Sequence, residues 1–154
     1  MTHGRVAMKE LRLDAARRRC HGRQIITFEQ LAVRLAGGLA QSVEEDPLLE
    51  AIRTVLPKTT LGELDGIKEL PGVVNAVART LRKAWRGGID LHARAPGHRR
   101  LGSMATLEAA VLKELPPAMK RPADLAAAAL NRLDHSARLF GRIEVVGLTE
   151  LSPV

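Results

Sequence analysis

Aromatic residues and cysteine are nearly absent from this chain. Its 154 residues include one Trp, two Phe, no Tyr and a single cysteine, Cys20. One cysteine excludes an internal disulfide, so we expect a reducing, cytoplasmic setting. So few rings exclude a stacking platform for single-stranded nucleic acid, because such platforms need several exposed aromatic side chains. No apolar run approaches the roughly 18–20 residues of a membrane-spanning helix, so we expect no contact with a membrane.

The motifs of nucleotide hydrolysis and metal-dependent DNA cleavage are also missing. No Gly-Lys pair occurs, whereas a P-loop needs that pair so that backbone amides and an ammonium hold the phosphates. No lysine follows Asp or Glu at an offset of two, the spacing that positions a metal and its attacking water in such nucleases. Cys20-His21 lacks the paired spacing of zinc ligands. We therefore predict no catalytic centre, no cofactor and no metal site.

Aliphatic residues are plentiful and predict a mainly helical fold. Hydrophobic residues make up 45% of the chain, and most are Leu and Ala, which favour helices over strands. A chain of this length has room for one domain with a real core. The start signals for the helices are a basic stretch over 5–19, a capping box at 27–30, Asp46-Pro47, a second capping box at 60–63, Pro71 and Pro122.

Two short β-branched runs predict strands. They cover residues 24–27 and 143–147, near the two ends of the chain. Such an isolated pair is marginal in water, so the two strands need each other or a further sheet. The chain stops soon after the second run, before anything could cover that strand, and we therefore expect a truncated domain.

The net charge of +7 is unevenly distributed. Residues 1–23 carry a charge of +5, residues 24–78 carry −4, residues 79–100 carry +6, and residues 101–154 are neutral. Two basic blocks around an acidic one favour a surface that faces a polyanion, because neutralising phosphates releases counterions. Solvated helix faces would give the same distribution, and both interpretations stay open.

The helix that Pro71 opens, and that Gly87-Gly88 should end, separates its side chains into two faces. The apolar face, which we expect in the core, carries Val74, Val77, Ala78, Leu81 and Trp85. The basic face has spacings of i, i+3, i+4 and i+7 and carries Arg79, Arg82, Lys83 and Arg86. These four cations are the candidate DNA-binding residues, because cations in a row contact phosphates without reading sequence. A solvated face, or one that docks onto a partner subunit, fits equally well.

Five segments carry a resemblance to a known family. They are QIITFEQL at 24–31, LPG at 70–72, LRKAWRGGIDL at 81–91, RPADL at 121–125 and IEVVGLTELSP at 143–153. Taken in this order, the chain resembles the amino-terminal, helicase-like region of bacterial AddB-type proteins of the PD-(D/E)XK nuclease family. The likeness covers most of residues 20–153, although none of these segments is a catalytic signature.

The resemblance implies a partial RecA-like core of the P-loop helicase type, interrupted by a large helical insertion. Residues 1–45 would form a helix, strand and helix of the core, 46–140 the insertion, and 141–154 a returning strand. The strands at 24–27 and 143–147 would then share one parallel sheet. AddB-type proteins process double-strand DNA ends for recombinational repair with a helicase–nuclease partner subunit. Since this chain lacks the catalytic motifs, the resemblance implies a scaffold or a contact to the DNA backbone.

Two other hypotheses remain from the sequence. The chain could be a self-contained basic helical regulator that binds DNA, which would need a helix-turn-helix. Its nearest candidate is the pair of helices within 99–134, but Pro116-Pro117 indicates a long connection between them. The chain could also be the inert product of a truncated gene, which would fold poorly alone.

Overall fold

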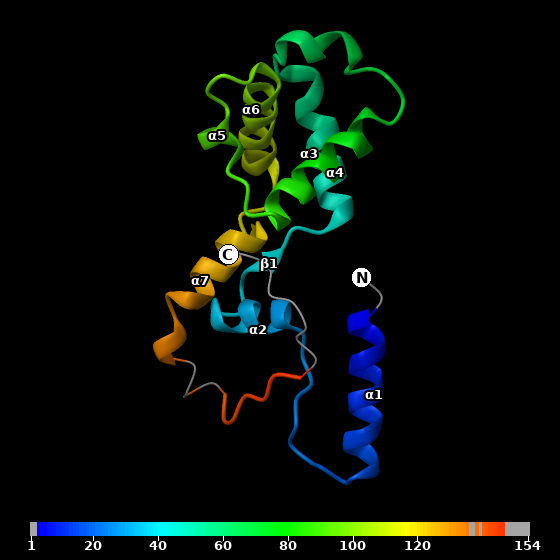
Figure 1. The fold of residues 1–154 in the computed structure, drawn as a ribbon, viewed down its shortest axis with the longest axis vertical. Helices are drawn as coiled ribbons and strands as arrows, with labels where there is room; N and C mark the ends of the chain where they lie inside the picture. The colour runs from blue at the N-terminus through cyan, green and yellow to red at the C-terminus, as the bar shows by residue number, and fades with distance from the viewer. Residues whose placement is uncertain (1–2, 136–137, 139, 147–154) are drawn as a thin grey trace.

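The computed structural model describes residues 3–135, 138 and 140–146, and it confirms a mainly helical protein with a small parallel sheet. Figure 1 shows two stacked parts: a helical lobe built from α3–α6, and a smaller unit containing α2 and α7, with α1 beside it. We call these the helical lobe and the α2–α7 unit. No helix in the described residues is long and apolar enough to cross a membrane.

The elements follow one another along the chain as α1 (His3–Arg17), α2 (Phe28–Leu35), β1 (Gln41–Ser42), α3 (Glu45–Val55), η1 (Leu56–Lys58), η2 (Gly62–Ile67), α4 (Val73–Arg86), α5 (Leu91–Arg94), α6 (Arg99–Glu114), β2 (Met119–Lys120), α7 (Pro122–Leu130) and η3 (Leu133–His135). The η elements are 3-10 helices.

The first predicted capping box is confirmed. The Gln30 amide donates to Thr27 Oγ1 at 3.1 Å, and the Thr27 amide donates to Gln30 Oε1 at 3.1 Å. This reciprocal pair satisfies two amides that a helix start otherwise leaves without partners. Proline at 47 lies in the first turn of α3 as expected, but the N-cap is Glu44 rather than Asp46.

The second predicted capping box, at Thr60, is wrong. Gly62 has a φ of 59°, whereas the second position of an α-helix needs a negative φ. The segment therefore forms the 3-10 helix η2, and Leu61 rather than Thr60 precedes it. Asp65 supplies the missing acceptor instead, because its Oδ1 accepts the Leu61 amide at 2.9 Å.

The core of the helical lobe lies between α3, α4 and α6. Its most deeply buried side chains are Leu48, Ile52, Leu81, Leu107 and Val111. They recur at helical spacing within each helix, so each helix buries one stripe and leaves the rest to solvent. Aliphatic side chains thus supply this core as the composition predicts.

A second and smaller cluster joins α2 to α7. It contains Ala32, Leu35, Leu125 and Ala129, which are mostly small side chains and remove little apolar area from water. Larger apolar side chains of the same unit stay exposed, with Phe28 70% and Leu39 88% accessible. The α2–α7 unit is therefore less completely covered than the helical lobe.

The sheet is a parallel pair, but it is not built from the strands that the sequence predicts. Gln41 pairs with Met119 and Ser42 with Lys120, and the Gln41 amide donates to the Ala118 carbonyl at 2.9 Å. These strands flank the helical lobe, so the chain leaves the α2–α7 unit through β1 and returns through β2 (Figure 1).

The strands predicted over 24–27 and 143–147 are wrong in the described residues. Residues 24–26 are irregular and Thr27 caps α2, while 143–146 are irregular and Gly147 lies outside the described residues. A strand needs a neighbour for its amides and carbonyls. Here the Ile25 carbonyl accepts a hydrogen bond from the Arg12 side chain instead, at 3.4 Å. A RecA-like core on these two segments is thus not confirmed.

Truncating a buried leucine of the lobe should destabilise the fold. Leu107 is fully buried, so Leu107→Ala removes apolar contacts and leaves a cavity, and we expect a loss of about 2–5 kcal/mol in the free energy of unfolding. Urea denaturation followed by circular dichroism measures it. The matched control is Leu39→Ala, which changes the same atoms at an 88% exposed position and should stay within about 0.5 kcal/mol. Equal losses in both variants would contradict this core.

Candidate nucleic-acid interface

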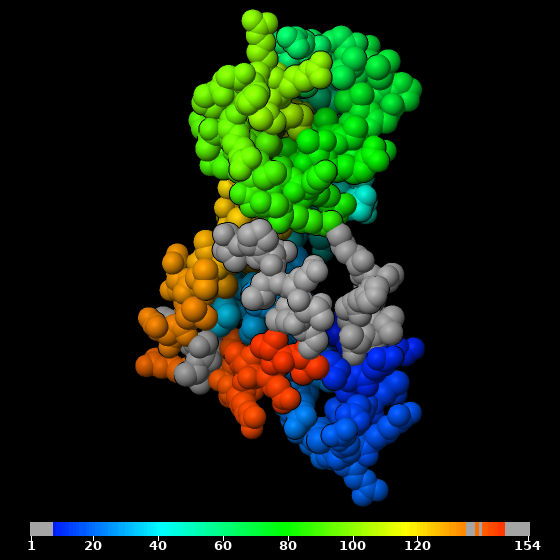
Figure 2. Space-filling view, viewed as in Figure 1, coloured from blue at the N-terminus to red at the C-terminus, as the bar shows by residue number. Residues whose placement is uncertain are grey.

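Helix α4 crosses one side of the helical lobe (Figure 1), and Figure 2 shows the outer surface of this lobe in green shades. Gly72, with a φ of 85°, precedes the helix, and Gly87 ends it. The buried face consists of Val77, Ala78, Leu81, Ala84 and Trp85. The two-faced helix that the sequence predicts is thus confirmed, although Val74 is only partly buried and Ala84 joins the buried face. The inner face anchors the helix to α3 and the rest of the lobe.

The four candidate cations differ in how they are held. Arg79, Lys83 and Arg86 are exposed, and no ion pair joins them to the described residues. Arg82 is half-buried, and its Nη1 lies 3.0 Å from Glu45 Oε2 in the first turn of α3. Helical geometry explains the difference, because Arg82 follows the buried Ala78 by one turn and so lies at the edge of the buried face.

The three exposed cations form a row along one side of α4. From Arg79 to Arg86 an α-helix rises about 10 Å. One strand of duplex DNA presents a phosphate about every 3.4 Å along its axis, so the row spans up to about three phosphates. Its spacing therefore suits a contact to a phosphate backbone. Backbone contacts of this kind set the position of a protein on DNA and carry no sequence information.

Two of the three exposed cations also stabilise helix α4 itself. Lys83 and Arg86 lie in the last turn of α4, where a cation stabilises the helix dipole by about 0.3–1 kcal/mol. Arg79 lies before that turn, so the dipole does not account for it. Arg79 is therefore the residue that best separates a binding face from a helix-stabilising one.

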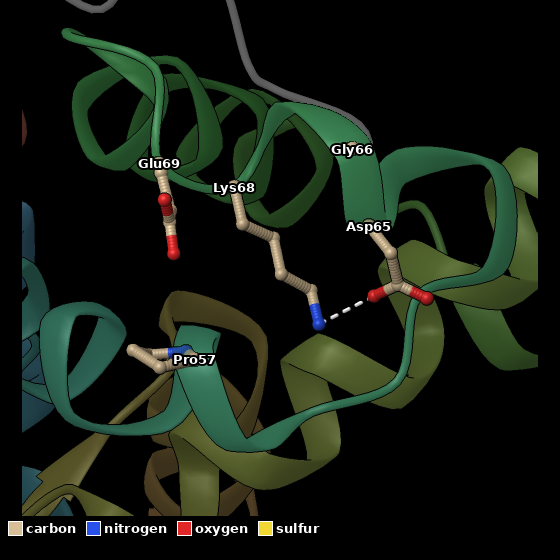
Figure 3. A pocket seen from close by; sticks show the side chains of 5 residues that line it. All are labelled: Pro57, Asp65, Gly66, Lys68 and Glu69. Carbon is tan, nitrogen blue, oxygen red and sulfur yellow. Dashed lines mark ion pairs between the residues drawn. The ribbon is translucent and has the colours of Figure 1, made fainter.

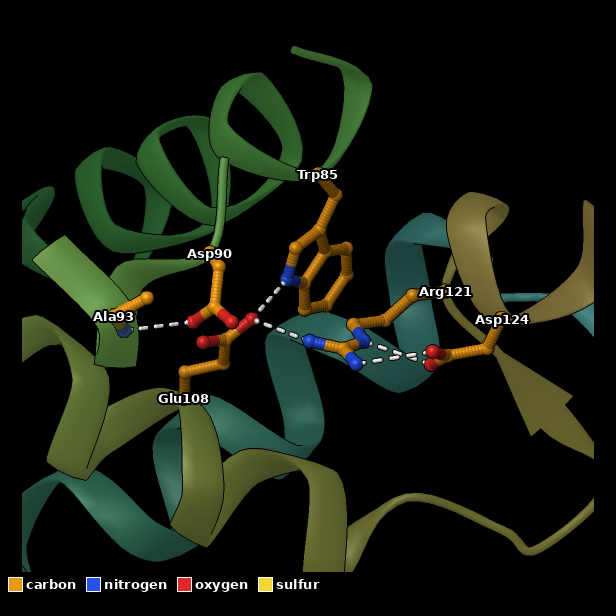
Figure 4. Close-up of polar contacts among 6 residues, drawn as sticks. All are labelled: Trp85, Asp90, Ala93, Glu108, Arg121 and Asp124. Carbon is orange, nitrogen blue, oxygen red and sulfur yellow. Dashed lines mark hydrogen bonds and ion pairs between the residues drawn. The ribbon is translucent and has the colours of Figure 1, made fainter. Parts of the chain in front are cut away.

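Trp85 faces inward and belongs to a polar network (Figure 4). Its Nε1 donates to Glu108 Oε1 at 2.5 Å, and Arg121 Nη1 donates to the same oxygen at 3.3 Å. Arg121 also makes a bidentate pair with Asp124, through Nε at 2.7 Å and Nη2 at 3.0 Å. The network thus connects α4, α6 and the start of α7.

In the described part of the chain Glu108 is the one buried charged residue, with 6% of its surface exposed. A buried carboxylate is stable only when it is paired and hydrogen-bonded, and Trp85 and Arg121 meet that need. The hydrogen bond with Asp124 raises the pKa of Arg121, and the nearby Glu108 charge adds to this rise. The sequence correctly predicts that Trp85 lies in the core, but it does not predict Glu108 as its hydrogen-bond partner. The sequence signal for this partner is Glu108 itself, a single acid among the buried apolar positions of α6.

A shallow cavity of about 400 Å³ lies between η1 and η2 and is lined by Pro57, Asp65, Gly66, Lys68 and Glu69 (Figure 3). Its lysine is already engaged, because Lys68 pairs with Asp65 and donates to the Thr59 carbonyl. Hydrogen bonds from Lys68 and the Leu61 amide lower the pKa of Asp65. These groups join η1 to η2, and we assign them no ligand. Within the described residues no group of three or more His, Cys, Asp or Glu could hold a metal ion.

No family model, no curated protein and no solved structure matches the chain. The interface is therefore inferred from the exposed face of α4 and from its chemistry.

The buried network predicts a stability effect of Arg121. Arg121→Gln leaves the Glu108 carboxylate without its cation, so we expect a loss of about 1–3 kcal/mol in the free energy of unfolding. Adding Glu108→Gln should recover part of this loss, since the buried group is then neutral. Chemical denaturation of the two single variants and the double variant measures the coupling.

The control for this cycle is Arg53→Gln. Arg53 pairs with Glu50 at 3.3 Å, with both side chains more than half exposed, and such surface pairs contribute about 0–1 kcal/mol. Strictly additive effects of the Arg121 and Glu108 changes would contradict the network.

Proposed function

We propose that this chain is a non-catalytic region of an AddB-like helicase–nuclease protein that processes double-strand DNA ends for recombinational repair. In this proposal α4 contacts the DNA backbone. The supporting observation is the row of exposed cations, Arg79, Lys83 and Arg86, on a helix whose opposite face is held in the core. A rigid helix presents such charges at fixed spacing, which favours binding at low entropic cost.

The proposed contact is to phosphates and therefore carries no sequence preference. Phosphate contacts set the position of a protein on DNA, whereas contacts to base edges specify the sequence. Trp85 is the aromatic side chain of α4, and it is buried and hydrogen-bonded to Glu108. Stacking on bases by this helix therefore has no support, and the proposed ligand is the backbone of duplex DNA.

The path of the chain supports the helical-insertion part of the proposal. The helical lobe lies between two neighbouring parallel strands, β1 and β2. Parallel neighbours require a long crossover connection, and here that connection is the whole lobe. We propose that the lobe is the insertion, which is shorter than the predicted 46–140 because α7 packs against α2, and that the flanking segments belong to a RecA-like core.

The exposed apolar side chains of the α2–α7 unit support contact with further protein. Phe28 and Leu39 are 70% and 88% accessible, so a further protein surface could remove their apolar area from water. The remainder of a RecA-like core, or the helicase–nuclease partner subunit of the proposed complex, would cover them.

The regulator hypothesis has less support. A helix-turn-helix joins its two helices by a turn of about three or four residues. Here α6 ends at Glu114 and α7 begins at Pro122, with β2 and the Pro116-Pro117 pair between them. The parallel strand in this connection favours the insertion over a compact DNA-reading motif.

Removing the row of cations should weaken duplex binding and its dependence on salt. Each phosphate contact contributes about −0.9 to the slope of log K against log salt. The triple variant Arg79→Gln, Lys83→Gln and Arg86→Gln should therefore reduce the slope by up to about 2.7, and Arg79→Gln alone by up to about 0.9. Fluorescence anisotropy with a labelled duplex of about 20 base pairs, between about 50 and 200 mM salt, measures it.

The control for the triple variant removes three exposed cations that are scattered over the molecule: Arg53, Lys113 and Arg142, each changed to Gln. Both variants lose the same net charge. Equal reductions of the slope would mean that overall charge, and not α4, attracts the DNA, and the proposal would be wrong.

A further inference from the structure

We propose that Glu45 masks Arg82, so that α4 offers three cations to DNA instead of four, and that the start of α3 forms the acidic edge of the interface. This inference rests on the proposed function of α4. It adds a residue that limits the binding strength of the site and sets its boundary.

The masking follows from the geometry of one ion pair. Arg82 Nη1 lies 3.0 Å from Glu45 Oε2, and the two side chains are 30% and 65% exposed. Arg82 points to the seam where α3 packs against α4, while the neighbouring cations of the row face solvent. The observed pair uses only Nη1 of Arg82, so Nε and Nη2 keep N–H donors. A phosphate that reached them would lie beside the negative charge of Glu45, and this repulsion disfavours the contact.

The neighbours of Glu45 strengthen this edge. Glu44, Glu45 and Asp46 are consecutive, and all three are exposed at the start of α3. Acids at a helix start also favour the helix dipole, so the same residues stabilise α3 and repel phosphates. A duplex on the row from Arg79 to Arg86 would therefore run along α4 and turn away from the start of α3.

Glu45→Gln tests the masking directly, because it removes the charge and keeps the size of the side chain. Arg82 should then be able to contact a phosphate. We expect the salt slope for a labelled duplex of about 20 base pairs to steepen by about 0.9, and affinity to rise about fivefold at about 0.1 M salt.

The matched control is Glu50→Gln. Glu50 lies on the same helix and pairs with Arg53 of α3 at 3.3 Å, so its removal changes the net charge equally without freeing a cation of α4. We expect less than about a twofold change in affinity and no change in slope. Equal gains for Glu45→Gln and Glu50→Gln would overturn the masking.

Arg82→Gln completes the test. In the native background it should leave the salt slope almost unchanged, since Arg82 is already paired. In the Glu45→Gln background it should abolish the gain. A clear reduction of the slope by Arg82→Gln alone would mean that Arg82 already contacts DNA, and masking would be wrong. Thermal melting by circular dichroism checks that each variant keeps its fold.

The failures of the two proposals are distinguishable. If the triple variant of the row binds duplex DNA like its scattered-cation control, the interface on α4 is wrong. If the row matters but Glu45→Gln behaves like Glu50→Gln, only the masking is wrong.

Discussion

Glu108 accepts hydrogen bonds from Trp85 of α4 and from Arg121 at the start of α7 through a single carboxylate oxygen. Burying this charge without partners would be costly, so both donors must stay where they are. The requirement fixes the rotation of α4, because its indole N–H has to face inward. It also fixes where α7 starts, because Arg121 directly follows β2 and in turn holds Asp124. The two parts of the molecule are connected through this network (Figure 4).

The orientation of α4 determines what the protein presents to solvent. With Trp85 and Leu81 directed into the lobe, the opposite side of the helix carries Arg79, Lys83 and Arg86 outward. The acidic segment before α4 neutralises other cations of the same basic block. Glu45 pairs with Arg82, and Glu63 lies 3.6 Å from Arg99. Part of the charge of +6 over residues 79–100 is thus paired with acids, whereas Arg79, Lys83 and Arg86 of α4 are exposed and make no ion pair with the described residues.

The sequence predicts the helices well, because their signals are local. The capping box at Thr27, Pro47 in a first turn and the glycines around α4 act within a few residues of the helix ends, and the helical spacing of apolar residues identifies the buried faces. The Thr60 box fails for an equally local reason, because Gly62 adopts a positive φ.

The features that the sequence does not predict depend on contacts between distant segments. The β-branched runs near Ile26 and Val145 resemble strands, but a strand forms only where a partner exists, and the pair that forms lies at Gln41 and Met119. Those strands are two residues long, which is too short for alternation to be visible. The ion pair between Arg82 and Glu45, which divides the predicted basic face, also joins distant segments.

Mapping the contact surface residue by residue tests the binding role of α4 most directly. Backbone amide shifts recorded by NMR during titration with a duplex of about 20 base pairs would locate the interface without any substitution. The largest changes should fall on the exposed positions of α4, with smaller ones at the start of α3 and little change in α1. Changes concentrated at Arg17, Arg18 and Arg19, with α4 unaffected, would show that the basic segment where α1 ends binds DNA and would contradict the interface proposed for α4.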